Sequence, residues 1–290
     1  MILSMTGFGK ALAELSDKKV SVEIKSLNSK QLDLNTRFPV IYREKEMEIR
    51  AFLLQAIERG KVDFSIFIEY ISNNSSTRIN RPIIEGYMSQ IREIAESLQI
   101  EAPTNWFSVL LKLPETIKSE IIELNEEEWQ VVYMAIKKAI GEFQSFRQQE
   151  GSMLEHLFQD KIHRIAALIP EIEKYEQERI DKVKTKMQEA LLKIDNPAYD
   201  ANRFEQELIF YIEKLDISEE KNRLINHLHY FKETMQTEKS QGRKLGFIAQ
   251  EIGREINTLG SKSNHAEMQK IVVQMKDELE QIKEQLLNVL

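Results

Sequence analysis

The chain has 290 residues, 42% of them hydrophobic and 30% charged, with a formal net charge of −7. A nucleic acid partner would therefore need a local basic surface rather than the overall field. The absence of cysteine excludes disulfides, thiol nucleophiles and cysteine-based zinc sites, and it suits the cytoplasm, where we expect the protein. The chain opens without the features of a signal peptide, and no run of about 18 apolar residues could span a membrane.

The first part of the chain alternates apolar and polar residues, as half-buried β-strands do. Val20, Val22 and Ile24 share one face in "KVSVEIK", and the alternation resumes in "KQLDLNTRF" after a turn. The stretch "YREKEMEIRAFLLQAIERG" predicts an amphipathic helix that ends at Gly60, with Arg59 in its last turn. "KVDFSIFIEY" predicts the next strand. The order β-β-α-β predicts a small α+β domain, which with short helices would occupy residues 1–125.

From Arg81 onward the pattern predicts helices and no further strands. One nearly unbroken helical pattern runs from Glu126 to Ile169, where Pro170 must kink or end it. Such a helix would be about 65 Å long, so it needs a second domain or another subunit to pack against. We therefore expect a long helical arm over residues 126–195.

The remainder of the chain, residues 196–290, predicts a C-terminal all-α domain. The polar stretch "KIDNPAYDANRF" at 193–204 is the clearest linker, and the last helix is expected at Asn264–Val289. The fold class predicted for the whole chain is α+β and mostly helical.

The segment "DISEEKNRLINH" gathers charged side chains on one stripe of a helix. Relative to Asp216, the residues Glu219, Glu220, Arg223 and His227 lie within about 60°. Two structural explanations compete with a functional one. Asp216 and Glu219 fit a capping box, and the other three fit an ion ladder worth about 0.2–0.5 kcal/mol per pair. The functional alternative depends on the imidazole of His227, a side-chain type that titrates near neutral pH and can act as a general acid or base.

The next helix, "GRKLGFIAQEIGREINTLGSKS", combines glycines with phosphate-binding residue types. Its four glycines line up within about 40°, which predicts a close helix–helix crossing. Arginine forks and amide donors, which suit phosphate oxygens, lie on the other side of that line at Arg243, Gln250, Arg254 and Asn257. A packing helix with an exposed polar edge is the simpler alternative.

Glu251 and Glu255, one turn apart, add carboxylates beside Arg254. A carboxylate cluster drawn from two helices, with histidine and arginine nearby, is what a divalent-metal phosphodiesterase needs. Spacing alone is a weak signal for such a site.

The residues above fall in blocks that occur in a characteristic order: "SMTGFGKA", "VEIKSLNSKQLDLNTRFP", "RGKV", "LKLPE", "FRQQEGSML", "NRFEQEL", "LDISEEKNRLINH" and "GRKLGFIAQEIGREINTLGSKS". Together they resemble the YicC/YloC family of bacterial endoribonucleases from end to end. The resemblance implies an N-terminal domain, a long helical arm and a C-terminal helical domain. It also implies divalent-metal-dependent RNA cleavage by a hexamer. Its strong matches include the two helices described above and Lys262.

The resulting hypothesis is a homo-oligomeric endoribonuclease, expected to be a hexamer, that hydrolyses RNA with Mn²⁺ or Mg²⁺ and has no membrane partner. His227 is expected to be the general acid/base, with Arg223 and Arg254 facing the scissile phosphate. The expected metal ligands are Asp216, Glu219, Glu220, Glu251 and Glu255. The expected substrate-binding residues are Arg37, Arg59, Lys61, Arg243, Gln250, Asn257 and Lys262.

Three alternatives stay open at this point. Arg59 and Lys61 of "RGKV" could form a basic rim that holds RNA, together with Arg37, or could simply complement the charge of a helix end. The whole protein could be a non-catalytic RNA-binding or adaptor protein whose long helices serve oligomerisation. Cleavage could also proceed without metal, with His227 acting as the base toward the ribose 2′-hydroxyl.

Overall fold

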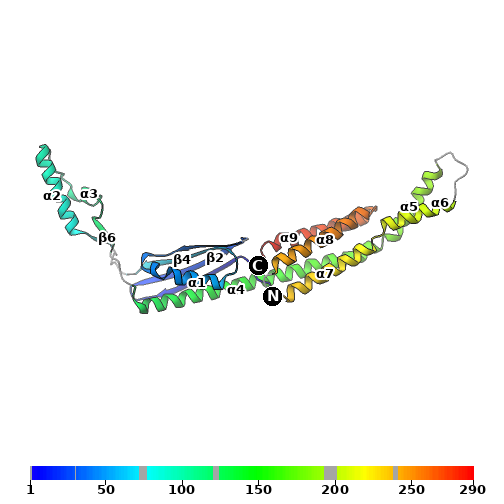
Figure 1. Cartoon of the computed structure of the whole chain (residues 1–290), viewed down its shortest axis with the longest axis horizontal. Helices are drawn as coiled ribbons and strands as arrows, with labels where there is room; N and C mark the ends of the chain where they lie inside the picture. The colour runs from blue at the N-terminus through cyan, green and yellow to red at the C-terminus, as the bar shows by residue number, and fades with distance from the viewer. Residues whose placement is uncertain (1, 30, 72–76, 120–123, 193–200, 238–240) are drawn as a thin grey trace.

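The computed structural model describes residues 2–29, 31–71, 77–119, 124–192, 201–237 and 241–290. Figure 1 shows an elongated molecule built along one long helix, α4 (Glu126–Glu173). An N-terminal sheet packs on the first half of α4, and a helical bundle packs on its second half. The two chain ends lie near the middle of the molecule, where the sheet and the bundle meet.

The N-terminal sheet has four strands in the order β1-β2-β4-β3, namely β1 (Gly7–Glu14), β2 (Lys18–Leu27), β4 (Gly60–Tyr70) and β3 (Leu32–Arg37). β3 runs parallel to β4, and the other neighbours are antiparallel. One face of the sheet packs against α4 and α1 (Glu46–Ala56), which follows a 3₁₀ turn, η1 (Val40–Lys45). Val20, Val22 and Ile24 are fully buried there, which confirms the predicted alternation.

Strand β1 is missing from the predicted order β-β-α-β. Its buried positions carry glycine and alanine, not the β-branched residues that signal a strand. The reason is the close approach of α4: a Cβ atom on Gly9 would lie 2.0 Å from the carbonyl oxygen of Ala139. Small residues are therefore required where the helix backbone lies directly on the sheet.

The predicted end of the first helix at Gly60 is wrong. Helix α1 ends at Ala56, and Ile57 adopts an extended conformation with φ −131° and ψ 118°. Ile57 is only 2% exposed, so its place in the core turns the chain before the glycine is reached. Gly60 instead begins β4 with φ +127°, a conformation that favours glycine. Arg59 therefore lies outside the helix.

The prediction that strands stop at Arg81 is also wrong. A short antiparallel pair joins β5 (Thr77–Ile79) to β6 (Ile117–Ser119). Three residues are too few for a periodic pattern to be recognised. Between these strands, α2 (Arg81–Leu98) and α3 (Trp106–Leu110) confirm the predicted helices.

Helix α4 confirms the long helical pattern and extends it slightly. The side chain of Asn125 caps its start by accepting a hydrogen bond from the Glu127 N–H at 3.1 Å. The helix passes Pro170 and ends at Glu173, and α5 (Glu176–Leu192) begins three residues later. The predicted helix end at Pro170 is therefore wrong by one turn, because the proline lies inside the last turn of α4.

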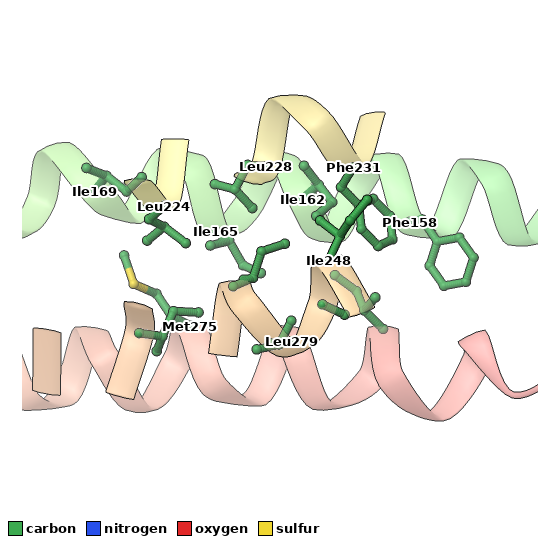
Figure 2. Close-up of a cluster of buried hydrophobic side chains, with 14 of the residues drawn as sticks. Phe158, Ile162, Ile165, Ile169, Leu224, Leu228, Phe231, Ile248, Met275 and Leu279 are labelled. Atoms are coloured by element: carbon green, nitrogen blue, oxygen red, sulfur yellow. The ribbon is translucent and has the colours of Figure 1, made fainter. Parts of the chain in front are cut away.

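The bundle consists of the second half of α4 with α7 (Ser218–Thr237), α8 (Gly242–Lys262) and α9 (Ala266–Leu286). Figure 2 shows the shared core, in which Phe158, Ile162 and Ile165 of α4 meet apolar side chains of the other three helices. The long helix therefore finds its second core within the same chain. Its length alone does not call for another subunit.

The three predicted segments, 1–125, 126–195 and 196–290, stay a prediction, because α4 shares its length between two cores. Most of the expected linker, residues 193–200, lies outside the described residues, and α6 (Ala201–Leu215) already contains its last four positions. Within the described ranges, every helix is too short or too polar to cross a bilayer.

Candidate functional site

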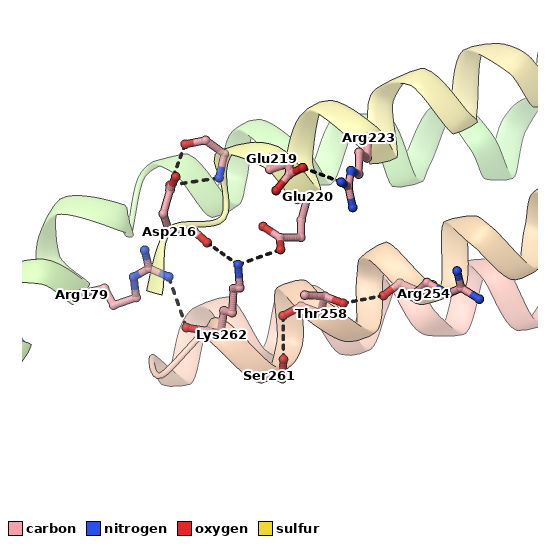
Figure 3. Close-up of polar contacts among 10 residues, drawn as sticks. Arg179, Asp216, Glu219, Glu220, Arg223, Arg254, Thr258, Ser261 and Lys262 are labelled. Atoms are coloured by element: carbon pink, nitrogen blue, oxygen red, sulfur yellow. Dashed lines mark hydrogen bonds and ion pairs between the residues drawn. The ribbon is translucent and has the colours of Figure 1, made fainter. Parts of the chain in front are cut away.

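The two helices that sequence analysis singles out, α7 and α8, form an antiparallel hairpin. Lys262 at the end of α8 binds Glu220 in the first turn of α7, with 2.7 Å between Nζ and Oε1. Apolar residues fill the seam between the helices, among them Leu224 and Leu228 from α7 and Ile252 from α8. Figure 3 shows the charged residues of the two helices, with Lys262 reaching from α8 to Glu220 of α7.

Asp216 precedes α7 and caps it. Its Oδ1 accepts hydrogen bonds from the N–H of Ser218 at 3.1 Å and from the hydroxyl of Ser218 at 2.8 Å. These bonds to Ser218 lower the pKa of Asp216 below its ordinary value. The predicted capping role is therefore confirmed, with Ser218 as the partner rather than Glu219.

Glu220 is a buried carboxylate that is only half satisfied. It is 7% exposed, and Oε1 pairs with Lys262. Its Oε2 is buried without a hydrogen-bond partner among the described residues. Lys262 is held in place by a second bond, from Nζ to the carbonyl oxygen of Asp216 at 2.9 Å. This ion pair fixes the geometry of the hairpin at the end where α7 begins.

The two arginines of the predicted site are exposed and loosely paired. Arg223 pairs with Glu219 on α7, and Arg254 pairs with Glu251 on α8 at 3.2 Å. The Arg254 side chain is 72% exposed. Exposed pairs of this kind are worth about 0–1 kcal/mol. Both guanidinium groups can therefore exchange their carboxylate partners for another anion at little cost.

His227 and Glu255 lie at the same level of the hairpin. His227 lies seven residues after Glu220 on α7, and Glu255 lies seven residues before Lys262 on α8. Seven residues make about two helical turns, so each residue lies on nearly the same side of its helix as the member of the ion pair that the helix carries. His227 is half-buried, and Glu255 is 5% exposed. Neither forms a hydrogen bond or ion pair with another residue in the described part of the chain. The imidazole of His227 on α7 and the buried carboxylate of Glu255 on α8 therefore lie at the same height of the hairpin.

The glycines of α8 confirm the predicted close crossing, and the partner is α9 with the residues that follow it. A Cβ atom on Gly253 would lie 3.3 Å from Leu279 and 3.5 Å from the Nζ of Lys283. Gly242 and Gly260 also lie against this partner, whereas Gly246 has no neighbour within 4 Å.

An open groove follows the crossing of α8 and α9. Two cations, two amides and two hydroxyls line it with Gly253: Arg254, Lys283, Gln250, Asn257, Thr258 and Ser261. The cations and amides suit phosphate oxygens, as predicted for Gln250, Arg254 and Asn257, whereas the two hydroxyls donate to carbonyl oxygens of α8. Lys283 was not predicted. It carries no motif of its own, and only the missing Cβ of Gly253 brings it close to α8.

The expected basic rim is not gathered in one patch. Arg37 ends β3 and Lys61 lies in β4, both exposed on the open face of the sheet. Arg59 is half-buried and donates a hydrogen bond to the carbonyl oxygen of Val289 at 3.2 Å. Burial and the neighbouring charge of Arg243 lower the pKa of Arg59. Arg59 therefore joins the sheet to the C-terminal residues of the chain, and the helix-end explanation does not apply to it.

The five predicted metal ligands do not form a metal centre within one chain. No group of three or more histidine, aspartate or glutamate residues in the described ranges is arranged to hold a metal ion. Asp216, Glu219, Glu220 and Glu251 each have another partner, and Glu255 is buried. The residues of a single chain do not fit a preformed metal cage.

The fold and the site define a class of protein in which a sheet and a helical bundle share one long helix, with a polar groove between α8 and α9 and a histidine on the neighbouring helix α7. Comparison with known families makes the assignment specific. Residues 2–156 match the family described as "Endoribonuclease YicC-like, N-terminal region", and residues 172–290 match "Endoribonuclease YicC-like, C-terminal". The chain belongs to the YicC-like endoribonuclease family, which confirms the resemblance seen in the sequence.

Two curated relatives align with this chain over the full length of both proteins. A protein of Clostridioides difficile (strain 630), named "Probable endoribonuclease YicC", is 31% identical over 296 residues. A protein of Haemophilus influenzae (strain ATCC 51907 / DSM 11121 / KW20 / Rd) with the same name is 28% identical over 297 residues.

Proposed function

We propose that this chain is an endoribonuclease that cleaves RNA phosphodiester bonds on the α7–α8 hairpin. The observation that carries the proposal is that His227 and Glu255 lie at the same height of the hairpin. The exposed Arg223 and Arg254 lie on the same two helices. The negative charge of a carboxylate at this height can stabilise the imidazolium that forms during proton transfer. The names of the two relatives support RNA as the substrate.

In this proposal His227 accepts the proton of the attacking hydroxyl or water while the new bond to phosphorus forms. The leaving oxygen departs as the bond to phosphorus breaks, and it takes up a proton. Arg223 and Arg254 hold the phosphate and offset the negative charge that develops on its oxygens. The groove of α8 and α9 would hold the RNA backbone on either side through Gln250, Asn257 and Lys283.

A requirement for a divalent metal, Mn²⁺ or Mg²⁺, remains part of the proposal, and no step above depends on it. Ions such as Mg²⁺ are often held by one or two carboxylates together with substrate phosphates rather than by a protein cage. Glu220, with one oxygen of its carboxylate unpaired, is the residue best suited to such a role. We further propose that the active form is a homo-oligomer, a hexamer by the family resemblance.

The test uses the purified full chain and end-labelled RNA, with and without a chelator. His227→Ala should reduce cleavage by at least about a hundredfold, the lower limit for a general acid/base. His229→Ala is the matched control, since His229 is exposed on the same helix about 160° away and should keep full activity. Equal cleavage by both variants would remove His227 from the chemistry.

The same experiment separates the rival functions. Loss of cleavage with the chelator supports the metal requirement. Cleavage that survives it and leaves cyclic phosphate ends shows that His227 activates the ribose 2′-hydroxyl without metal. RNA binding without any cleavage would identify a non-catalytic RNA-binding or adaptor protein.

A further inference from the structure

A small pocket lies where the N-terminal segment, α4 and the end of α9 meet. It encloses about 290 Å³ and uses Ser4, Thr6 and Glu150 as part of its lining. This volume is just below the range of about 300–1,000 Å³ seen for drug-sized ligands, so it suits one small ring system. Ser4, Thr6 and Glu150 belong to the sequence blocks "SMTGFGKA" and "FRQQEGSML", which the α7–α8 hairpin leaves unused.

The polar floor of the pocket is fixed by a chain of hydrogen bonds. The hydroxyl of Thr6 donates to Oε2 of Glu150, and it lies 2.8 Å from the hydroxyl of Ser4. The N–H of Thr6 also donates to the Ser4 hydroxyl at 3.2 Å. Thr6 is the only hydrogen-bond donor to Glu150 among the described residues. The carboxylate is therefore held in position with Oε1 still able to accept hydrogen bonds.

A buried arginine lies directly behind this floor. Arg147, one turn before Glu150 on α4, is 5% exposed and donates to the carbonyl oxygen of Ser4 at 2.7 Å. Its positive charge offsets that of the carboxylate, which weakens the attraction of the pocket for a cation. A neutral ligand with N–H donors suits the floor better.

The walls and the rim specify the shape of that ligand. Leu154 and Leu157 of α4 are half-buried in the wall, and Met153 is 69% exposed beside them. Such side chains pack well against a flat aromatic face. The amides of Gln285 and Asn288 lie at the rim and can donate to a carbonyl oxygen. The pocket thus combines apolar walls with a carboxylate acceptor and amide donors.

We propose that this pocket binds a guanine base of the RNA, with Glu150 accepting hydrogen bonds from the N1–H and the amino group. Guanine carries two adjacent N–H donors beside a carbonyl acceptor on its Watson–Crick edge, the edge that RNA-binding proteins read on unstacked bases. Adenine and cytosine would bring a ring acceptor against the carboxylate, and uracil offers one donor only. This proposal rests on the proposed function, because RNA would supply the base.

The test measures binding of the four nucleoside 5′-monophosphates to the full chain by calorimetry. All four carry the same phosphate, so differences between them report the base. Guanosine monophosphate should bind about tenfold or more tightly than adenosine monophosphate. Inosine monophosphate, which lacks the amino group, should bind less tightly than guanosine monophosphate. Equal affinity for all four nucleotides would overturn the proposal.

Variants locate the binding in the pocket. Glu150→Gln should abolish the preference for guanine, whereas Glu284→Gln, an exposed position on α9, should keep it. Thr6→Val removes the hydroxyl that holds the carboxylate and should weaken the preference without changing the charge. A preference that survives both pocket variants would refute the assignment. Preferential binding without RNA cleavage would refute the proposed function alone, and cleavage without the preference would refute the pocket alone.

Discussion

Ser218 controls the state of a carboxylate at the start of the candidate site. Its N–H and hydroxyl bind Asp216 and lower the pKa of that carboxyl group. A lowered pKa in the folded state stabilises the protein above the ordinary carboxyl pKa of about 3.9. That stabilisation is lost as the pH falls through the folded value.

We therefore expect Ser218→Ala to raise the pKa of Asp216 toward its ordinary value. At neutral pH the variant should lose about 0.5–1.5 kcal/mol of unfolding free energy, the usual net worth of one hydrogen bond, because the N–H of residue 218 still donates to Asp216. The difference from the wild type should shrink in acid, where Asp216 is protonated in both proteins. NMR titration and urea unfolding measure the two effects. Ser152→Ala, which removes an exposed hydroxyl from α4, serves as the control. An unchanged pKa of Asp216 would show that the Ser218 hydroxyl does not stabilise the charged carboxylate.

At the residue scale, the sequence predicted the two helices α7 and α8 but not the partners of their side chains. Helical spacing correctly put Glu220 and His227 on one stripe of α7, because the angle per residue is fixed, whereas Asp216 precedes the helix. Spacing could not show that Glu220 pairs with Lys262, which lies 42 residues away. It also could not show that Arg59 is half-buried against the last residues of the chain. Such partners depend on how the elements pack.

At the element scale, α5 is attached to the candidate site by a buried side chain. Arg179 is 4% exposed and donates a hydrogen bond to the carbonyl oxygen of Lys262 at 3.3 Å. Burial lowers the pKa of Arg179, while the nearby carboxylates of Glu176 and Asp216 oppose that shift. Lys221 of α7 adds a second link, since it binds Glu176 at 2.7 Å. The position of α5 is thus coupled to the residues around Glu220.

Arg179→Met should loosen this attachment while the apolar core of the bundle stays intact. The variant loses a charged hydrogen bond, worth about 1.5–3 kcal/mol. We expect faster amide hydrogen exchange in α5 and in the last turn of α8. Lys184→Met, an exposed position on the same helix, should leave the exchange unchanged. Equal exchange in both variants would show that Arg179 does not hold α5 in place.

Long helices were predictable as elements, whereas one strand and one helix end were not. The pattern of α4 is strong because apolar residues recur over 48 residues. Strand β1 lacks large apolar residues because α4 lies directly on Gly9, and a single sequence does not reveal that contact. Gly60 resembles a helix end, but its positive φ serves the start of a strand. Local signals fail where tertiary packing sets the residue type.

At the scale of the whole molecule, the length of α4 is no longer the reason to expect an oligomer. Helix α4 has a core at each end within one chain, so its length no longer demands a partner. Helix α6 instead exposes three large side chains, Ile209, Phe210 and Tyr211, at 56%, 58% and 44%. Large apolar side chains that stay exposed on one helix can be buried by a protein partner.

We therefore expect the wild-type protein to show a mass several times 34.0 kDa by light scattering at micromolar concentration. Ile209→Gln combined with Phe210→Gln should shift the mass toward the monomer, because burial of two large apolar side chains contributes about 1.5–3 kcal/mol each. Glu205→Gln with Glu207→Gln changes exposed positions on the same helix and should leave the mass unchanged. A monomeric wild type would refute the oligomer. An oligomer that survives the apolar double variant would show that its interface lies elsewhere than α6.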